Sequence, residues 1–136
     1  SMAAKLAHPN KEVVCLYGDG AFGMTAFDME TAQRFGAPYL AVVGNNSAMN
    51  QIRYGQLSKY GEERGDVGNK LGDVPFSKFG DMIGGYGEEV TEAGQIQPAM
   101  QRAREAIAKT GKCAVVNVWV DPNEYAPGTK AQTMYK

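Results

Sequence analysis

The sequence predicts an α/β fold, with a doubly wound, mostly parallel sheet and helices on both faces. Two observations favour this fold. Short apolar runs alternate with helical patterns along the chain, which is the order of elements that builds a parallel sheet. Two of these runs end in short polar motifs, Gly18-Asp19-Gly20 and Asn45-Asn46, at the points where a buried strand would stop and a loop would begin.

The first half of the chain predicts a strand, a helix and a second strand. Residues 12–17 form a β-rich apolar run closed by glycine, which is typical of a strand buried on both faces. Thr25 and Asp28 resemble a capping box, so we expect a helix to begin near Thr25 and to end before Gly36. Residues 39–43 predict a second buried strand. Such a strand–helix–strand unit crosses over right-handedly in nearly all cases.

The second half of the chain is less regular. Residues 55–73 are polar, glycine-rich and charged, and they predict a long loop. A loop of this length in a compact domain is more often functional or mobile than idle. Residues 76–83 predict a short helix, and residues 88–90 a brief strand. Apolar residues at helical spacing predict a longer helix over residues 96–110, and a strong apolar run predicts a strand over residues 113–120.

These elements divide the chain into an α/β domain, residues 1–120, and a polar tail, residues 121–136. Residues 3–7 are typical of the end of a helix whose beginning is missing. A doubly wound sheet normally has a strand ahead of such a helix. We therefore expect an N-terminally truncated domain rather than a whole protein.

Composition excludes several classes of partner. The chain of 136 residues is 43% hydrophobic and 21% charged, with a net charge of −1, as in ordinary globular domains. This charge gives no reason to expect nucleic acid or a membrane surface as a partner. No apolar run approaches the roughly 18 residues that a membrane span needs. Cys15 and Cys113 lie inside apolar runs, which predicts core residues of a reduced, cytoplasmic protein.

The two polar motifs predict a site at one edge of the sheet, because neighbouring parallel strands end at the edge where such sheets bind ligands. Asp19 and Asn46 offer a carboxylate and an amide oxygen, and Mg²⁺ prefers oxygen ligands and completes its shell with phosphates and water. Gly18 and Gly20 allow close approach of the backbone, and the following helix start favours an anion. Gly-Asp-Gly alone also fits a simple tight turn. Together the motifs predict a metal-bridged diphosphate.

Residues 18–24 and 43–46 resemble the signature of thiamine-diphosphate-dependent enzymes. In that family the paired motif lies in the domain that binds the diphosphate, so the chain is expected to be an incomplete domain of this kind. Within the family it is most similar to the branch that contains acetolactate synthase, oxalyl-CoA decarboxylase and 2-hydroxyacyl-CoA lyase. Residues 125–130 and 132–136 resemble bacterial 2-hydroxyacyl-CoA lyases most. The resemblance implies a carbon–carbon lyase acting on 2-hydroxyacyl-CoA thioesters.

The resemblance also implies roles for individual residues. The metal ligands would be the side chains of Asp19 and Asn46 and the backbone carbonyl of Ala48. The side chain of Asn50 would reach a phosphate oxygen, or would be a solvated loop asparagine. The following backbone groups would lie against the diphosphate: the Gly18 turn and the amides of Gly20, Ala21, Met49 and Asn50.

The same resemblance implies a partner. The glutamate that activates the cofactor belongs to the pyrimidine-binding domain of a second subunit, so the full-length protein is expected to be a homodimer or homotetramer and this chain alone to be inactive. An acyl-CoA would be the substrate. Residues 121–136 would form a lid over the site or a disordered tail.

Other functions are compatible with the same predicted fold. The chain would belong to an enzyme like acetolactate synthase or oxalyl-CoA decarboxylase, or would be a non-catalytic small subunit that binds the cofactor together with a partner chain. A magnesium phosphohydrolase is disfavoured, because Ala21-Phe22-Gly23 follows Gly20 where that class has an asparagine-aspartate pair.

Overall fold

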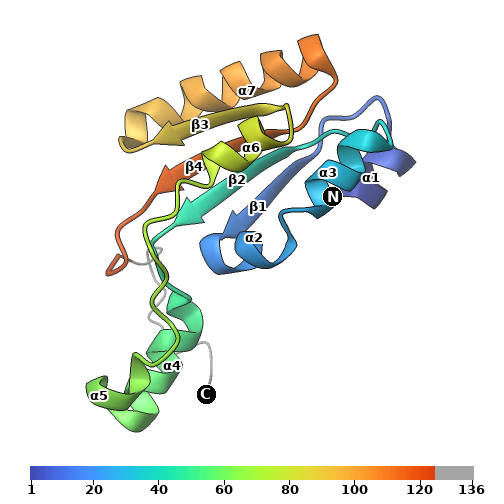
Figure 1. The fold of residues 1–136 in the computed structure, drawn as a ribbon. Coiled ribbons are helices and arrows are strands. Elements are labelled where there is room, and N and C mark those ends of the chain that lie inside the picture. Colours follow the sequence, from blue (N-terminus) through green and yellow to red (C-terminus); the bar gives the residue numbers. More distant parts are fainter. Residues whose placement is uncertain (125–136) are drawn as a thin grey trace.

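A four-stranded, all-parallel sheet forms the centre of the computed structural model, which describes residues 1–124 (Figure 1). The strands lie in the order β1-β2-β4-β3. Their bounds are β1 (Val14–Gly18), β2 (Leu40–Asn45), β3 (Tyr86–Val90) and β4 (Ala114–Trp119). The predicted α/β class with a parallel sheet is therefore confirmed, and all the described strand pairs are parallel.

Helices cover both faces of the sheet, as predicted (Figure 1). The helices on one face are α2 (Asp19–Thr25), α3 (Asp28–Arg34) and α6 (Ser77–Met82), and α1 (Met2–Ala7) packs against α3. The other face carries α7 (Ile96–Thr110), which follows the short 3₁₀ helix η1 (Ala93–Gln95). The helix α7 ends at Gly111, whose φ of 66° gives the left-handed cap expected of glycine.

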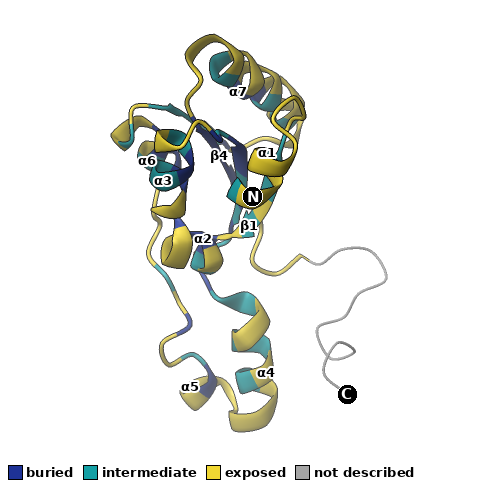
Figure 2. Cartoon of the chain, turned by 90° about the vertical axis from the view of Figure 1, so that its right-hand side faces the viewer, coloured by how far each residue is buried: buried dark blue, intermediate teal, exposed yellow. Residues whose placement is uncertain are grey.

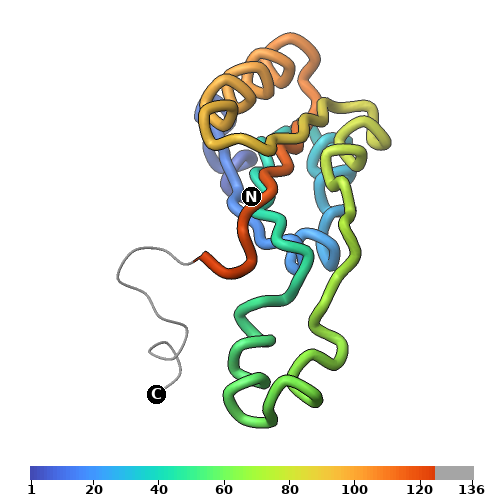
Figure 3. The backbone as a smooth tube through the Cα atoms, turned by 90° about the vertical axis from the view of Figure 1, so that its left-hand side faces the viewer, coloured from blue at the N-terminus to red at the C-terminus, as the bar shows by residue number. Residues whose placement is uncertain are grey.

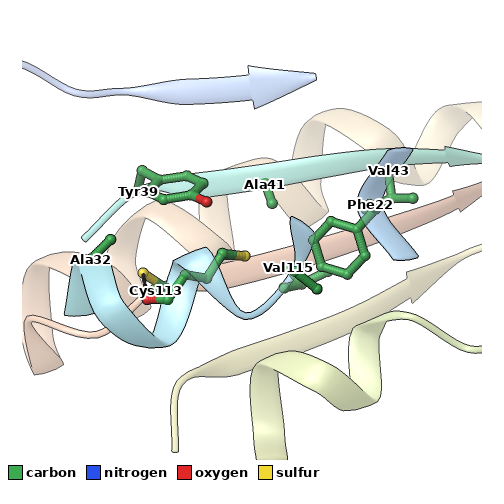
Figure 4. Close-up of a cluster of buried hydrophobic side chains, with 9 residues drawn as sticks. Phe22, Ala32, Tyr39, Ala41, Val43, Cys113 and Val115 are labelled. Carbon is green, nitrogen blue, oxygen red and sulfur yellow. Dashed lines mark hydrogen bonds between the residues drawn. The ribbon is translucent and has the colours of Figure 1, made fainter. Parts of the chain in front are cut away.

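Phe22 is the centre of the core between α2, α3, α6 and the sheet. Its side chain has no exposed surface and makes edge-to-face contacts with Tyr17, Phe76 and Phe79, at ring-centre distances of 5.3, 5.4 and 5.7 Å. Figure 4 shows its ring beside Val115 of β4. This packing fixes α2, the helix that begins at the first polar motif, against the sheet.

The opposite face is packed by small residues of α7. Ala99 and Ala103 are fully buried against apolar side chains of β2, β3 and β4. Alanines at this spacing let the helix approach the sheet closely. Within residues 1–124 no helix combines the length and the apolar character that a bilayer span requires.

Strand β1 was predicted to be buried on both faces, and this prediction is wrong. The strand lies at the edge of the sheet, and α7 covers only β2, β3 and β4. On that face Val14 is 38% exposed and Leu16 is 79% exposed. Apolar residues of a strand indicate that the strand is able to be buried, but they do not say whether a neighbouring element covers it.

The helix expected from near Thr25 to before Gly36 is α3, which begins a little later, at Asp28. A helix that the sequence did not indicate, α2, begins at Asp19, directly after β1. The expected capping box does not form, because the Thr25 hydroxyl donates to the carbonyl of Ala21 and α3 has no side-chain cap. Burial of Phe22 stabilises a helical turn in a segment whose glycines disfavour helix, so tertiary packing overrides the local propensity.

The predicted loop over residues 55–73 is wrong for residues 55–65, whereas residues 66–73 form turns and irregular structure as expected. Helix α4 (Asn50–Tyr60) and helix α5 (Glu62–Gly65) form an arm that projects beyond the carboxyl edge of the sheet, as Figures 1 and 3 show. We call residues 50–65 the helical arm. Helix α4 has no buried residue, and Figure 2 shows the arm as mostly exposed. A helix that is polar all round has no hydrophobic periodicity, which is why the sequence did not indicate it.

An ion pair holds the helical arm to the segment that follows it, and a second ion pair within that segment shares the same carboxylate. The guanidinium of Arg53 binds the carboxylate of Asp66, and Lys70 Nζ lies 2.8 Å from the same carboxylate. Arg53, and then Lys70, lower the pKa of Asp66 to about 2. Since the unfolded-state value is about 4, these pairs stabilise the arm above about pH 4, and the stabilisation is lost as the pH falls towards 2.

We expect the substitution Asp66→Asn to loosen the helical arm at pH 7. Chymotrypsin should then cleave after Tyr60, which is 53% exposed, about a few times faster than in the wild type. The matched control is Asp81→Asn, which removes a more distant ion pair of α6. Equal cleavage rates for all three proteins would show that Asp66 does not hold the arm.

Candidate functional site

The two polar motifs meet at the carboxyl edge of the sheet, as predicted. Strands β1 and β2 are neighbours, and Gly18 lies opposite Gly44. Asp19 begins α2, and its Oδ2 accepts hydrogen bonds from the backbone amides of Asn46 and Ala48, at 3.2 and 3.0 Å. One carboxylate therefore joins the end of β1 to the loop after β2, which we call the 46–48 loop.

The Asp19 side chain is a buried charge. The residue is 3% exposed, and its Oδ1 also accepts the amide of Gly20 at 2.7 Å. In the part of the chain that the structure describes, none of the ion pairs involves Asp19. Within residues 1–124 the carboxylate is bonded to three backbone amides, and a carboxylate removed from water is costly without a positive partner. The site therefore fits a bound cation.

The 46–48 loop is held from the side opposite Asp19 by a returning segment, residues 69–74. The amide of Met49 donates to the carbonyl of Asn69 at 2.8 Å, and the amide of Leu71 donates to the carbonyl of Ser47 at 2.7 Å. These two bonds flank an antiparallel bridge between Ala48 and Lys70. In such a pair the N–H and C=O of the central residue point away from the partner strand. The Ala48 carbonyl therefore points to the side on which Asp19 lies.

Three oxygen atoms of the kind that Mg²⁺ prefers thus come together at this edge: a carboxylate oxygen of Asp19, Oδ1 of Asn46 and the carbonyl oxygen of Ala48. The hydrogen bonds that link Asp19 to the amides of Asn46 and Ala48 hold the set in place. The chemistry of this set suits a hard divalent cation with open positions for phosphate oxygens.

The predicted diphosphate-facing groups are arranged differently from the expectation. The amide of Met49 does not face the site, because it donates to Asn69. The amide of Gly20 donates to the carboxylate of Asp19. The side chain of Met49 lies over Gly20, where a Cβ would come within 2.9 Å of Met49 Cγ. Gly20, in the first turn of α2, therefore lies against a flexible side chain.

Asn50 makes a contact that the sequence did not suggest. Its Nδ2 donates to the carbonyl of Pro122 at 2.8 Å, and the Tyr54 hydroxyl donates to the same carbonyl at 2.6 Å. These bonds join α4 to the segment after β4. The predicted lid comprises residues 121–136. Of these, only residues 121–124 are among the described residues, and the rest of the predicted lid lies outside them.

Two asparagines of the site had no role assigned from the sequence. Asn45 has no exposed surface, and its side chain accepts the amide of Ser47 and donates to the carbonyl of Val74, at 3.1 and 2.9 Å. It thereby supports Ser47, which has a φ of 56°. Asn45 is part of the Asn45-Asn46 motif, and this motif is the feature of the sequence that could have indicated its role. Asn69 lies in a polar stretch, and nothing in the sequence distinguished it.

An open cavity of about 490 Å³ adjoins the 46–48 loop. Its lining includes Asn46, Ser47 and Asp73 on one side and Thr91 and Trp119 on the other. Ser47 Oγ donates to Asp73 Oδ1 at 2.6 Å, which closes one wall. A ligand bound at the end of β2 therefore has free space beside it.

Comparison with known proteins agrees with this site. Residues 1–118 match the family "Thiamine pyrophosphate enzyme, C-terminal TPP binding domain". The matched residues include both polar motifs and the whole 46–48 loop. The presence of a thiamine diphosphate-binding domain, expected from the motifs, is thereby confirmed.

The chain is similar to curated enzymes with different names. The chain is 33% identical over 127 residues to the acetolactate synthase large subunit IlvG of Mycobacterium tuberculosis, covering 93% of this chain and 22% of the relative. It is 29% identical over 130 residues to the mouse 2-hydroxyacyl-CoA lyase 2, covering 95% and 20%. A sulfoacetaldehyde acetyltransferase of Alcaligenes xylosoxydans is 31% identical over 117 residues, covering 86% and 19%. This chain spans about a fifth of the length of these relatives, and it belongs to the thiamine pyrophosphate enzymes, as their C-terminal cofactor-binding domain.

Proposed function

We propose that this chain is the diphosphate- and Mg²⁺-binding part of a thiamine-diphosphate-dependent carbon–carbon lyase that acts on 2-hydroxyacyl-CoA thioesters. The main support for the proposed metal site is the buried Asp19 carboxylate. It joins both motifs and has no ion-pair partner among residues 1–124. The likeness to the mouse 2-hydroxyacyl-CoA lyase 2 supports the reaction class.

In this proposal Asp19, Asn46 and the carbonyl of Ala48 hold the metal. The thiamine group, when bound, supplies the electron sink for chemistry next to a carbonyl, and the protein supplies binding and orientation. Gly18 lets the backbone approach the diphosphate, and the amide of Ala21, in the first turn of α2, faces its negative charge, whereas the amide of Gly20 is already bonded to Asp19. The unbranched Met49 side chain must turn aside from Gly20 to expose this turn.

The described residues also bear on the proposed role of Asn50. Its Nδ2 donates to Pro122, while its buried Oδ1 accepts no hydrogen bond within residues 1–124. One of the two N–H donors of this amide is thus already used, which leaves only one for a phosphate oxygen. We therefore favour the backbone amide of Asn50, at the start of α4, as the group that faces the diphosphate, with its side chain as an anchor for the segment after β4.

The remaining machinery is proposed to lie outside this chain. A glutamate from the pyrimidine-binding domain of a second subunit would activate the cofactor, and the full-length protein would be a homodimer or homotetramer in the cytoplasm. Both described cysteines, Cys15 and Cys113, are free thiols, which is compatible with a reducing compartment.

A second candidate is an acetolactate synthase-like enzyme, which the 33% identity to the Mycobacterium tuberculosis relative favours. Two further candidates would use the same site: an oxalyl-CoA decarboxylase-like enzyme and a non-catalytic cofactor-binding subunit. The assay described next distinguishes them from the lyase.

We expect the full-length protein that contains this chain to cleave 2-hydroxyacyl-CoA into an aldehyde and formyl-CoA, dependent on thiamine diphosphate and Mg²⁺. The same preparation is assayed with pyruvate and with oxalyl-CoA. Condensation of pyruvate without cleavage of 2-hydroxyacyl-CoA would mean that the enzyme is a synthase and not a lyase. Turnover of oxalyl-CoA alone would favour the decarboxylase. The 136-residue chain, assayed in parallel, should show no turnover, and turnover by it would contradict the need for a glutamate from another domain.

A further inference from the structure

Asn69 lies between the helical arm and the 46–48 loop and contacts both. The residue is 3% exposed. Its side-chain Nδ2 donates to Oε1 of Gln56 on α4, at 2.5 Å, and to the carbonyl of Gly65 on α5, at 2.9 Å. Its backbone carbonyl accepts the amide of Met49 at 2.8 Å. A single buried residue therefore joins both helices of the arm to the loop that carries two of the proposed metal ligands.

The backbone contact of Asn69 sets the direction of a ligand atom. The carbonyl of Ala48 and the amide of Met49 belong to one planar trans peptide, so they point in opposite directions. While the Met49 amide is bonded to Asn69, the Ala48 carbonyl points away from Asn69, out of the bridge with Lys70 and to the side on which Asp19 accepts the Ala48 amide. If the segment at Asn69 shifts, this peptide plane loses its partner on that side and the carbonyl is free to rotate away from the metal.

The side-chain contacts of Asn69 determine where its backbone lies. Helix α4 has no buried residue, so the arm has little apolar packing to fix it on the domain. Gly65 packs directly on α4, where a Cβ would come within 2.6 Å of Leu57 Cα. The side-chain amide of Asn69 donates hydrogen bonds to both helices at this contact, to Gln56 of α4 and to Gly65 of α5. The order of the arm is thereby transmitted to residue 69.

We propose that Asn69 is a positioning residue for the bound divalent cation: it orients the Ala48 carbonyl through Met49 and makes this orientation depend on the folded state of the helical arm. The proposal rests on the proposed function of the Asp19 site. It gives the arm a regulatory role, because any partner or substrate that orders the arm also strengthens metal binding at the 46–48 loop.

The two cations Mg²⁺ and Ca²⁺ respond differently to a misplaced ligand. Mg²⁺ demands near-octahedral geometry, whereas Ca²⁺ accepts six to eight oxygens in a flexible arrangement. Loss of a group that orients a metal ligand typically weakens metal affinity by about 10- to 100-fold. A defect in orientation should therefore affect Mg²⁺ more than Ca²⁺, whereas a general loss of stability should affect both alike.

The test is calorimetric binding of thiamine diphosphate to the full-length protein over a series of Mg²⁺ or Ca²⁺ concentrations. For Asn69→Ala we expect the half-saturating Mg²⁺ concentration to rise about tenfold and that of Ca²⁺ by about threefold or less. The matched control is Asn117→Ala, which removes another fully buried asparagine, whose side chain on β4 donates to Glu89 of the neighbouring strand β3. It should lower the thermal midpoint and leave the ratio of the two metal requirements unchanged.

An unchanged Mg²⁺ requirement in Asn69→Ala would overturn the proposal, as would an equal rise for Mg²⁺ and Ca²⁺. If this variant does not fold, Gln56→Ala removes one acceptor of the Asn69 side chain, and a smaller shift in the same direction is expected. No shift in that variant would also overturn the proposal. Failure of the wild type to bind thiamine diphosphate with either metal would instead contradict the proposed function itself.

Discussion

The substitution Asp19→Ala is expected to weaken Mg²⁺-dependent binding of thiamine diphosphate by about 100-fold or more, because it removes the charged ligand of the proposed metal site. It also removes the acceptor of three backbone amides, so the 46–48 loop loses its attachment to α2. The isosteric Asp19→Asn should weaken binding nearly as much, since it keeps the shape but removes the negative charge. Calorimetry on the full-length protein measures both.

The control for this experiment is Asp28→Asn, at the exposed start of α3, which has no contact with the 46–48 loop. It should bind the cofactor as the wild type does. Equal affinity in the wild type and both Asp19 variants would mean that Asp19 is not a ligand. In that case its buried carboxylate would serve only to fasten the loop, and the variants would differ from the wild type in stability alone.

The substitution Phe22→Ala is expected to lower the free energy of unfolding by about 3–5 kcal/mol, because it leaves a cavity where a fully buried ring was packed. The lost contacts include three aromatic neighbours, from β1, from α6 and from the residue before α6. Urea unfolding of this chain followed by circular dichroism measures the change. A decrease of that size is a large part of the stability of an ordinary domain.

Phe35→Ala is the matched control for Phe22→Ala, because Phe35 follows α3 and is 61% exposed. Its effect should stay within about 0.5 kcal/mol. If Phe22→Ala were equally mild, the aromatic cluster would not be the centre of the core. Because α2 carries Gly20 and Ala21 in its first turn, cofactor binding should also weaken in Phe22→Ala, as a consequence of the displaced helix.

The sequence was sufficient to predict the sheet and the meeting of the two motifs, because short apolar runs that end in glycine mark strands, although they did not show that β1 lies at an uncovered edge. It did not predict α4, since a helix without an apolar face leaves no periodic pattern. It did not predict α2 either, because the burial of Phe22 outweighs the glycines of that helix. The importance of Asn69 arises only from contacts between residues 13 and 20 positions apart, with Gln56 and Met49.

The exposed edge of the sheet has a consequence for work with this chain on its own. The outer side of β1 presents backbone groups with no strand beside them among the described residues, and Leu16 stands 79% exposed on its uncovered face. An apolar strand edge is a template on which another chain can add a strand, and natural proteins protect such edges. We therefore expect the isolated chain to self-associate through its first strand as its concentration is raised.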